Sequence, residues 1–179
     1  MIECDQDVRP PLESCGDRVR IAAATGGNVQ VALREKPGGG QPNLGAARFM
    51  GYDAVLGGAR GVWYSSATQA SGTAQELRAM APIFASGRPV ELPFPAPAEG
   101  WGARVWTYHG RDYLVLANRT GNRYWRVPEE ALRSAWRPLF EARRDPRELL
   151  HAAQGAHYLK PYQVLVLESR LRLSRLLGS

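Results

Sequence analysis

A helix, a glycine-rich turn and a short apolar strand follow one another in Phe49-Met-Gly-Tyr-Asp-Ala-Val-Leu-Gly-Gly-Ala-Arg-Gly-Val-Trp-Tyr-Ser65. Apolar side chains recur near helical spacing over residues 44–56, and Gly57-Gly58 is typical of the point where a helix ends. Residues 61–64 then form a short apolar run, which predicts a buried strand with two aromatic residues at its carboxyl end. The stretch therefore predicts a helix packed on a sheet, followed by a strand of that sheet.

Size and charge narrow the class of protein. The chain has 179 residues, enough for one ordinary domain or two small ones, and a formal net charge of +6. Only Lys36 and Lys160 are lysines among the 23 basic residues, and Arg143-Arg144 is the only adjacent pair, so no basic run marks a phosphate track. We expect no nucleic-acid partner.

Targeting and redox signals are weak. No apolar run approaches the roughly 18 residues of a membrane span, and the N-terminus lacks the basic and apolar regions of a signal peptide. We therefore expect a soluble, cytoplasmic protein with no membrane partner. The two cysteines, Cys4 and Cys15, are close enough in sequence to pair, but two thiols make no disulfide framework, and a reduced pair is expected.

The first half of the chain shows further elements. Strands are expected at 19–22 and 29–33, separated by a hairpin-type turn at Gly26-Gly27-Asn28. A second helix begins at Ser71 and ends before Gly87.

The second half changes from helical to alternating periodicity. Four prolines lie between residues 89 and 100, which indicates a linker or an edge segment. Beyond them, a hairpin with a four-residue loop at 109–112 and several further short strands predict an antiparallel sandwich. Its tryptophans could form a carbohydrate-binding face, but their spacing is more typical of the core: Trp101, Trp106, Trp125 and Trp136. The expected further strands lie at 124–127, 135–140 and 162–168.

Several of these segments, in this order, resemble clan A glycoside hydrolases of the beta-galactosidase-like kind, family 42 and its relatives. Residues 48–64 resemble the seventh helix and eighth strand of their barrel, and Glu76-Leu-Arg-Ala-Met-Ala-Pro82 resembles its last helix. Leu159, Pro161 and Val164 match the pattern of their final sandwich strand. The resemblance spans about residues 44–168.

The resemblance implies an α+β chain: an incomplete (β/α) barrel remnant at 1–88, followed by a C-terminal antiparallel β-sandwich at 89–179. A complete barrel needs about 200 residues or more. Because an incomplete barrel has exposed edges, the strand at 61–64 is expected to pair with residues 1–35 or with another subunit. We therefore expect mixed strand pairing and a homo-oligomer.

The resemblance also implies a site. Retaining glycosidases use two carboxyl groups, an acid/base and a nucleophile. If residues 1–5 are the seventh strand, Glu3 takes the nucleophile position, and Asp5 is a candidate acid/base beside the other nearby carboxylates, Asp7, Glu13 and Asp17. An exposed residue at a frayed terminus is the alternative for Glu3.

Substrate contacts are expected from the aromatic pair. Trp63 and Tyr64 are candidates for stacking on a sugar ring; at least one of them is expected in the core, and Tyr64 is the better ligand candidate. The three histidines have no ligand spacing, and no motif for a metal, nucleotide or other cofactor is present.

Two hypotheses follow. In the first, the protein hydrolyses beta-linked glucosides or galactosides by a carboxylate-based mechanism. In the second, it is a non-catalytic carbohydrate-binding or structural fragment of a glycosidase.

Overall fold

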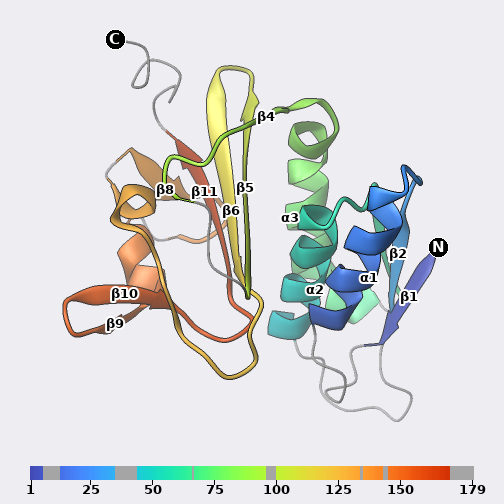
Figure 1. Cartoon of the computed structure of the whole chain (residues 1–179), viewed down its shortest axis with the longest axis horizontal. Helices are drawn as coiled ribbons and strands as arrows, with labels where there is room; N and C mark the ends of the chain where they lie inside the picture. Colours follow the sequence, from blue (N-terminus) through green and yellow to red (C-terminus); the bar gives the residue numbers. More distant parts are fainter. Residues whose placement is uncertain are drawn as a thin grey trace. The chain divides into compact units, whose positions relative to one another are not determined.

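The computed structural model describes residues 1–5, 13–34, 44–65, 67–95, 100–133, 135–142 and 145–169. These form two compact units, Met1–Ala81 and Pro82–Ser179. The helices gather in the first unit and the longer strands in the second (Figure 1).

The first unit alternates strands and helices. Its elements are β1 (Ile2–Asp5), α1 (Glu13–Ala24), β2 (Gln30–Arg34), α2 (Leu44–Leu56), β3 (Gly61–Tyr64) and α3 (Ala67–Ser86), the last of which crosses the boundary between the units. The three strands are parallel, in the order β1-β2-β3. Parallel neighbours joined by helices are the βαβ arrangement.

The helices of this unit cover a single face of the sheet. Val31 and Leu33 of β2 are fully buried beneath these helices, and Val19 of α1 is also fully buried. Helices α1 and α2 approach closely at Gly16 of α1, where an added Cβ would lie 1.8 Å from the Asp53 Oδ2 atom of α2. Arg20 Nη2 donates to Asp53 Oδ1 at 2.7 Å beside this contact. Close packing therefore depends on the absence of a side chain at position 16.

Two expectations for the first unit are wrong. Residues 19–22 lie inside α1 and form no strand, so the turn at 26–28 leads from a helix to β2 and closes no hairpin. Pairing within the described sheet is wholly parallel, not mixed. The strand at 61–64 pairs with β2, which lies within residues 1–35 as expected.

Helical spacing explains the first of these differences. Cys15 and Val19 are both buried and lie four residues apart, on one side of the helix. Tertiary packing of that side against the sheet and α2 outweighs the strand preference of the short apolar run at 19–22.

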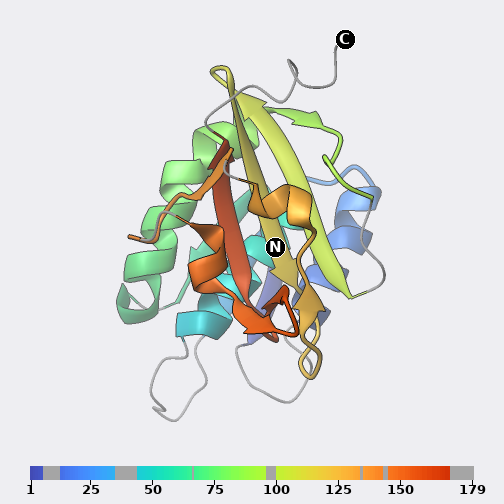
Figure 2. The same cartoon turned by 90° about the vertical axis from the view of Figure 1, so that its left-hand side faces the viewer.

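The second unit is built from antiparallel strands and two 3-10 helices, η1 (Glu129–Leu132) and η2 (Pro146–Leu149). Its strands are β4 (Arg88–Val90), β5 (Trp101–Tyr108), β6 (Arg111–Asn118), β7 (Trp125–Arg126), β8 (Trp136–Pro138), β9 (His151–Ala153), β10 (Ala156–Leu159) and β11 (Val164–Ser169). A five-stranded sheet has the order β4-β5-β6-β11-β8, and a three-stranded sheet has the order β7-β10-β9. Figure 2 shows β11 beside the β5–β6 hairpin.

One face of the larger sheet carries the core of this unit. Val105, Leu114 and Leu167 are fully buried there, and Leu159 of the smaller sheet joins them. Trp101 and Trp136 belong to the same core, as the sequence predicts.

The β5–β6 turn is tighter than expected. The strands pair from Tyr108↔Arg111 onward, so the loop has two residues, His109 and Gly110, rather than four. Both have positive φ, 46° and 77°, as a type I′ turn requires.

Helices and antiparallel sheets together agree with the α+β class. The incomplete barrel, the sandwich and the boundary at residue 88 remain predictions.

Candidate functional site

The register of the parallel sheet sorts its side chains onto two faces. Glu3, Ala32 and Trp63 are lateral neighbours in one row. Cys4, Leu33 and Tyr64 form the next row, and side chains alternate between faces along a strand. The second row faces the helices, so Glu3 and Trp63 lie on the opposite side, which we call the open face.

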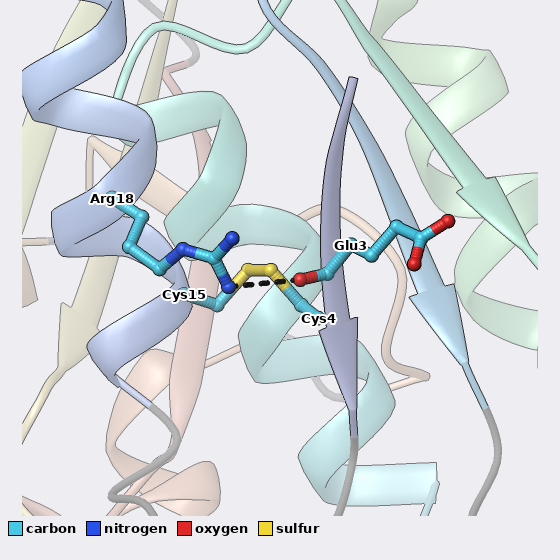
Figure 3. The surroundings of a disulfide bond; sticks show 4 residues. All are labelled: Glu3, Cys4, Cys15 and Arg18. Carbon is cyan, nitrogen blue, oxygen red and sulfur yellow. Dashed lines mark hydrogen bonds between the residues drawn. A yellow bond between two sulfur atoms is a disulfide. The ribbon is translucent and has the colours of Figure 1, made fainter.

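Glu3 is held on the open face by an arginine. Its Oε1 atom forms an ion pair with Arg34 Nη2, and both side chains are about half exposed, 53% and 52%. The backbone is held separately, because Arg18 Nη1 donates to the Glu3 carbonyl oxygen at 3.0 Å. Figure 3 shows the Glu3 side chain directed away from α1.

The aromatic pair is divided by the alternation of β3. Trp63 is 60% exposed, on the side of Glu3. Tyr64 turns to the helices, where its Oη donates to the Ala47 carbonyl at 3.4 Å. Burial, and after it the Glu76 carboxylate, raise the pKa of the Tyr64 phenol above its ordinary value. Of the two candidates for sugar stacking, Trp63 is thus the one on the same face of the sheet as Glu3.

A disulfide lies directly behind Glu3. Cys4 of β1 and Cys15 of α1 are bonded, with their Cα atoms 5.7 Å apart, and both are buried (Figure 3). The expectation of a reduced pair is therefore wrong. It rested on cysteine number alone, whereas α1 brings Cys15 back against the strand that carries Cys4.

The structure describes few of the candidate acid/base groups. Asp7 and the side chains of Asp5 and Glu13 lie outside the described part of the chain. Asp17 is on α1, on the helix side of the sheet, and forms an ion pair with Arg20 at 3.4 Å. It is not brought together with Glu3.

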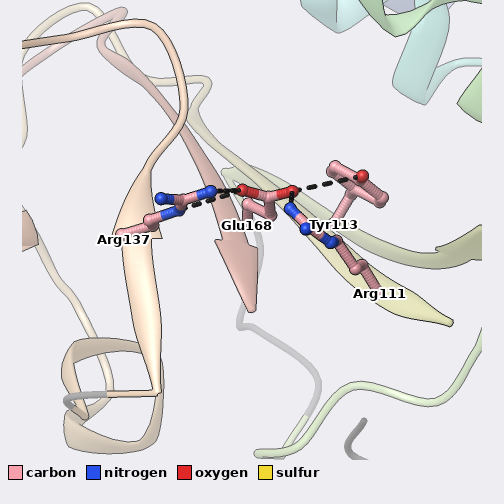
Figure 4. Close-up of polar contacts among 4 residues, drawn as sticks. All are labelled: Arg111, Tyr113, Arg137 and Glu168. Atoms are coloured by element: carbon pink, nitrogen blue, oxygen red, sulfur yellow. Dashed lines mark hydrogen bonds and ion pairs between the residues drawn. The ribbon is translucent and has the colours of Figure 1, made fainter. Parts of the chain in front are cut away.

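A second polar cluster, in the larger antiparallel sheet, was not predicted. The Glu168 side chain is 5% exposed; its Oε1 accepts from Arg111 Nη1 at 2.6 Å and its Oε2 from Arg137 Nε at 2.9 Å (Figure 4). Tyr113 Oη also donates to Oε1, at 3.3 Å. A lone acidic residue in the apolar run of β11 was the available signal.

These contacts set the charge of Glu168. Burial alone would raise the pKa of its carboxyl, but the hydrogen bonds and charges of Arg111 and Arg137 outweigh burial and hold that pKa below its ordinary value. Arg111, Arg137 and Tyr113 each donate to Glu168, so we assign this cluster to holding β6, β8 and β11 together.

Two further kinds of site were searched for in the described residues. They contain no group of three or more His, Cys, Asp or Glu side chains arranged to hold a metal ion. Among these same residues, no helix combines the length and apolar character needed to cross a membrane.

Comparisons with known proteins find distant similarity only. No protein-family model matches the chain, and no curated protein matches it. An alpha-amylase from Anoxybacillus, described as a new glycosyl hydrolase subclass, has 11% identity and a TM-score of 0.49 over 91% of this chain and 46% of its own. A family 30 endoxylanase from Clostridium papyrosolvens has 12% identity and a TM-score of 0.43 over 93% of this chain and 48% of its own.

This chain thus spans about half the length of these two solved structures. Both similarities are too distant to support an argument about its function.

Proposed function

We propose that this is a glycosidase-like protein that binds carbohydrate on the open face of its parallel sheet. The observation that carries the proposal is the row in which exposed Trp63 lies level with Glu3, which is paired with Arg34. The sequence resemblance to glycoside hydrolases points to the same ligand class.

The residues of this face suit a sugar. An exposed indole offers a large apolar surface to the C–H face of a pyranose ring. The Arg34 guanidinium donates hydrogen bonds and the Glu3 carboxylate accepts them, which matches the mixed donors and acceptors of sugar hydroxyls. Two strand spacings separate the Cα atoms of Glu3 and Trp63, about 10 Å, so one ligand can contact both side chains.

Hydrolysis of beta-linked glucosides or galactosides is the second candidate. It is favoured by the half-exposed carboxyl group of Glu3 in a parallel strand, where a substrate can reach its oxygen atoms for attack on an anomeric carbon. A retaining mechanism also requires a second carboxyl group about 5–5.5 Å away. Asp5, two residues further along β1, is the proposed acid/base.

Binding is tested by titrating the protein with cello- and galacto-oligosaccharides in a calorimeter. We expect Trp63→Ala to weaken binding about tenfold or more, because an aromatic contact contributes roughly 1.5 kcal/mol or more. Tyr124→Ala is the matched control, because Tyr124 is a similarly exposed aromatic residue, 53%, in the second unit. Equal affinity in wild type and Trp63→Ala would refute the binding proposal.

Hydrolysis is tested separately with nitrophenyl beta-glucoside and beta-galactoside. Activity in the wild type that is lost in Glu3→Gln would support the catalytic role of Glu3. Equal activity in both proteins would remove Glu3 from the mechanism, and no activity in either would leave binding as the function.

The expected homo-oligomer, in which the exposed sheet edges pair with another copy, is likewise a proposal. Size-exclusion chromatography with light scattering tests it, and a well-behaved monomer would count against it.

A further inference from the structure

Strand β1 has few attachments for a strand that carries a candidate site residue. It has four residues, and in the described part of the chain it pairs only with β2. Backbone hydrogen bonds to a single neighbour stabilise an edge strand this short only a little, so it frays readily. Other contacts must therefore hold Glu3 in place.

Helix α1 supplies two such contacts, to two adjacent residues of β1, Glu3 and Cys4. Cys15, near the start of the helix, is bonded to Cys4, and Arg18, one turn later, donates to the carbonyl oxygen of Glu3. The first contact is covalent and buried; the second is a hydrogen bond from an exposed side chain. The disulfide is thus the strongest attachment of β1 outside its ladder.

We propose that the Cys4–Cys15 disulfide is a redox-controlled clasp that fixes β1 on the sheet, and that its reduction releases the open face. Reduction by a dithiol adds two electrons and two protons to the Sγ–Sγ bond. It yields two cysteine thiols, while the dithiol closes to its own disulfide. With the clasp open, β1 frays, and the Glu3 carboxylate separates from Arg34.

Burial governs how the clasp opens. Cys4 and Cys15 are each 4% exposed, so a reducing thiolate reaches the sulfur atoms only when β1 moves away from α1. The reduction rate therefore depends on local opening, and the clasp stays closed in the folded state until β1 opens. Since disulfides persist in oxidising compartments, the clasp favours such a compartment over the expected cytoplasm.

The test is hydrogen–deuterium exchange, read by mass spectrometry, on the full chain before and after incubation with dithiothreitol. Reduction is expected to speed exchange in residues 1–5 by at least about tenfold, because the loop-closure constraint is lost. Strands β6 and β11 of the second unit serve as the internal reference and are expected to exchange at an unchanged rate. This readout needs no ligand, so it is independent of whether sugar binds.

The variant Cys4→Ala/Cys15→Ala is the matched control. It should show fast exchange in residues 1–5 with and without dithiothreitol; if it does not fold, the reduced wild type alone decides. Unchanged exchange in residues 1–5 after reduction would overturn the proposal, as would two alkylatable thiols in the oxidised protein once denatured. Equal acceleration in β6 and β11 would also overturn it, because the effect would then be global.

Discussion

Replacing Glu168 by glutamine tests whether a buried carboxylate holds three strands of the antiparallel sheet together. The substitution keeps the size and one carbonyl acceptor of the side chain but removes its charge. Glu168 stands on β11, and its two arginine partners stand on β6 and β8, the neighbours of β11 on either side.

The expected loss in the free energy of unfolding follows from the contacts of Glu168. Both carboxylate oxygens accept charge-assisted hydrogen bonds, which contribute about 1.5–3 kcal/mol each when well buried. The carboxylate is buried, but the guanidiniums are about half exposed, 58% and 45%, so water screens them and replaces part of what is lost. We therefore expect Glu168→Gln to lower the free energy of unfolding by about 2 kcal/mol at pH 7.

The loss of stability caused by Glu168→Gln should become smaller as the pH falls. Because the folded-state pKa of Glu168 is held below its ordinary value of about 4.5, the carboxylate stabilises the fold fully above that ordinary pKa. That contribution disappears as the pH falls through the folded-state pKa. Below about pH 4 the difference between wild type and Glu168→Gln should shrink toward zero.

Urea unfolding followed by tryptophan fluorescence measures this difference at pH 7 and at pH 3.5. Glu129→Gln is the control, because Glu129 forms an exposed ion pair with Arg147 at 3.4 Å and should cost less than about 0.5 kcal/mol. A difference for Glu168→Gln that stays the same at both pH values would refute the reasoning, since packing rather than charge would then be responsible.

Two further substitutions test the packing of each unit by the same unfolding measurement. Gly16→Ala should destabilise the first unit by about 2–3 kcal/mol, because its Cβ would overlap Asp53; the control Gly72→Ala, with no atom within 4 Å, should be neutral or stabilising. Equal effects would contradict the close approach of α1 and α2. Asn118→Asp should cost about 3 kcal/mol, because the Asn118 amide donates to the carbonyls of Arg123, Leu159 and Lys160, which a carboxylate repels. A loss below about 1 kcal/mol would show that these carbonyls find other donors.

The elements that the sequence predicts well are those with strong local signals. The helix over 44–56 and the strand after it are found where the apolar spacing and Gly57-Gly58 place them. The expectation that this strand is buried is wrong, because its residues are only partly buried and Trp63 is exposed. The buried tryptophans of the antiparallel unit are also found, since alternation along β5 and β8 requires an inward side for each.

The elements that it predicts poorly depend on partners distant in sequence. Residues 19–22 of α1 have a strand-like composition. Their helical conformation is favoured by the packing of α1 against β1 and α2. The Glu168 cluster joins residues up to 57 positions apart, so no local spacing reveals it. The disulfide is invisible for the same reason: its geometry exists only once α1 folds back onto β1.

The candidate site shows how alternation along a strand places two adjacent aromatic residues in different surroundings. Trp63 and Tyr64 are adjacent, and a strand sends adjacent side chains to opposite faces. Tyr64 lies in the row of Cys4, so it is on the same side of the sheet as the disulfide and is half-buried there. Trp63 lies in the row of Glu3, so its exposed side chain would contact a ligand bound on the open face. A ligand that stacks on Trp63 therefore cannot touch the disulfide, but it depends on the strand that the disulfide holds.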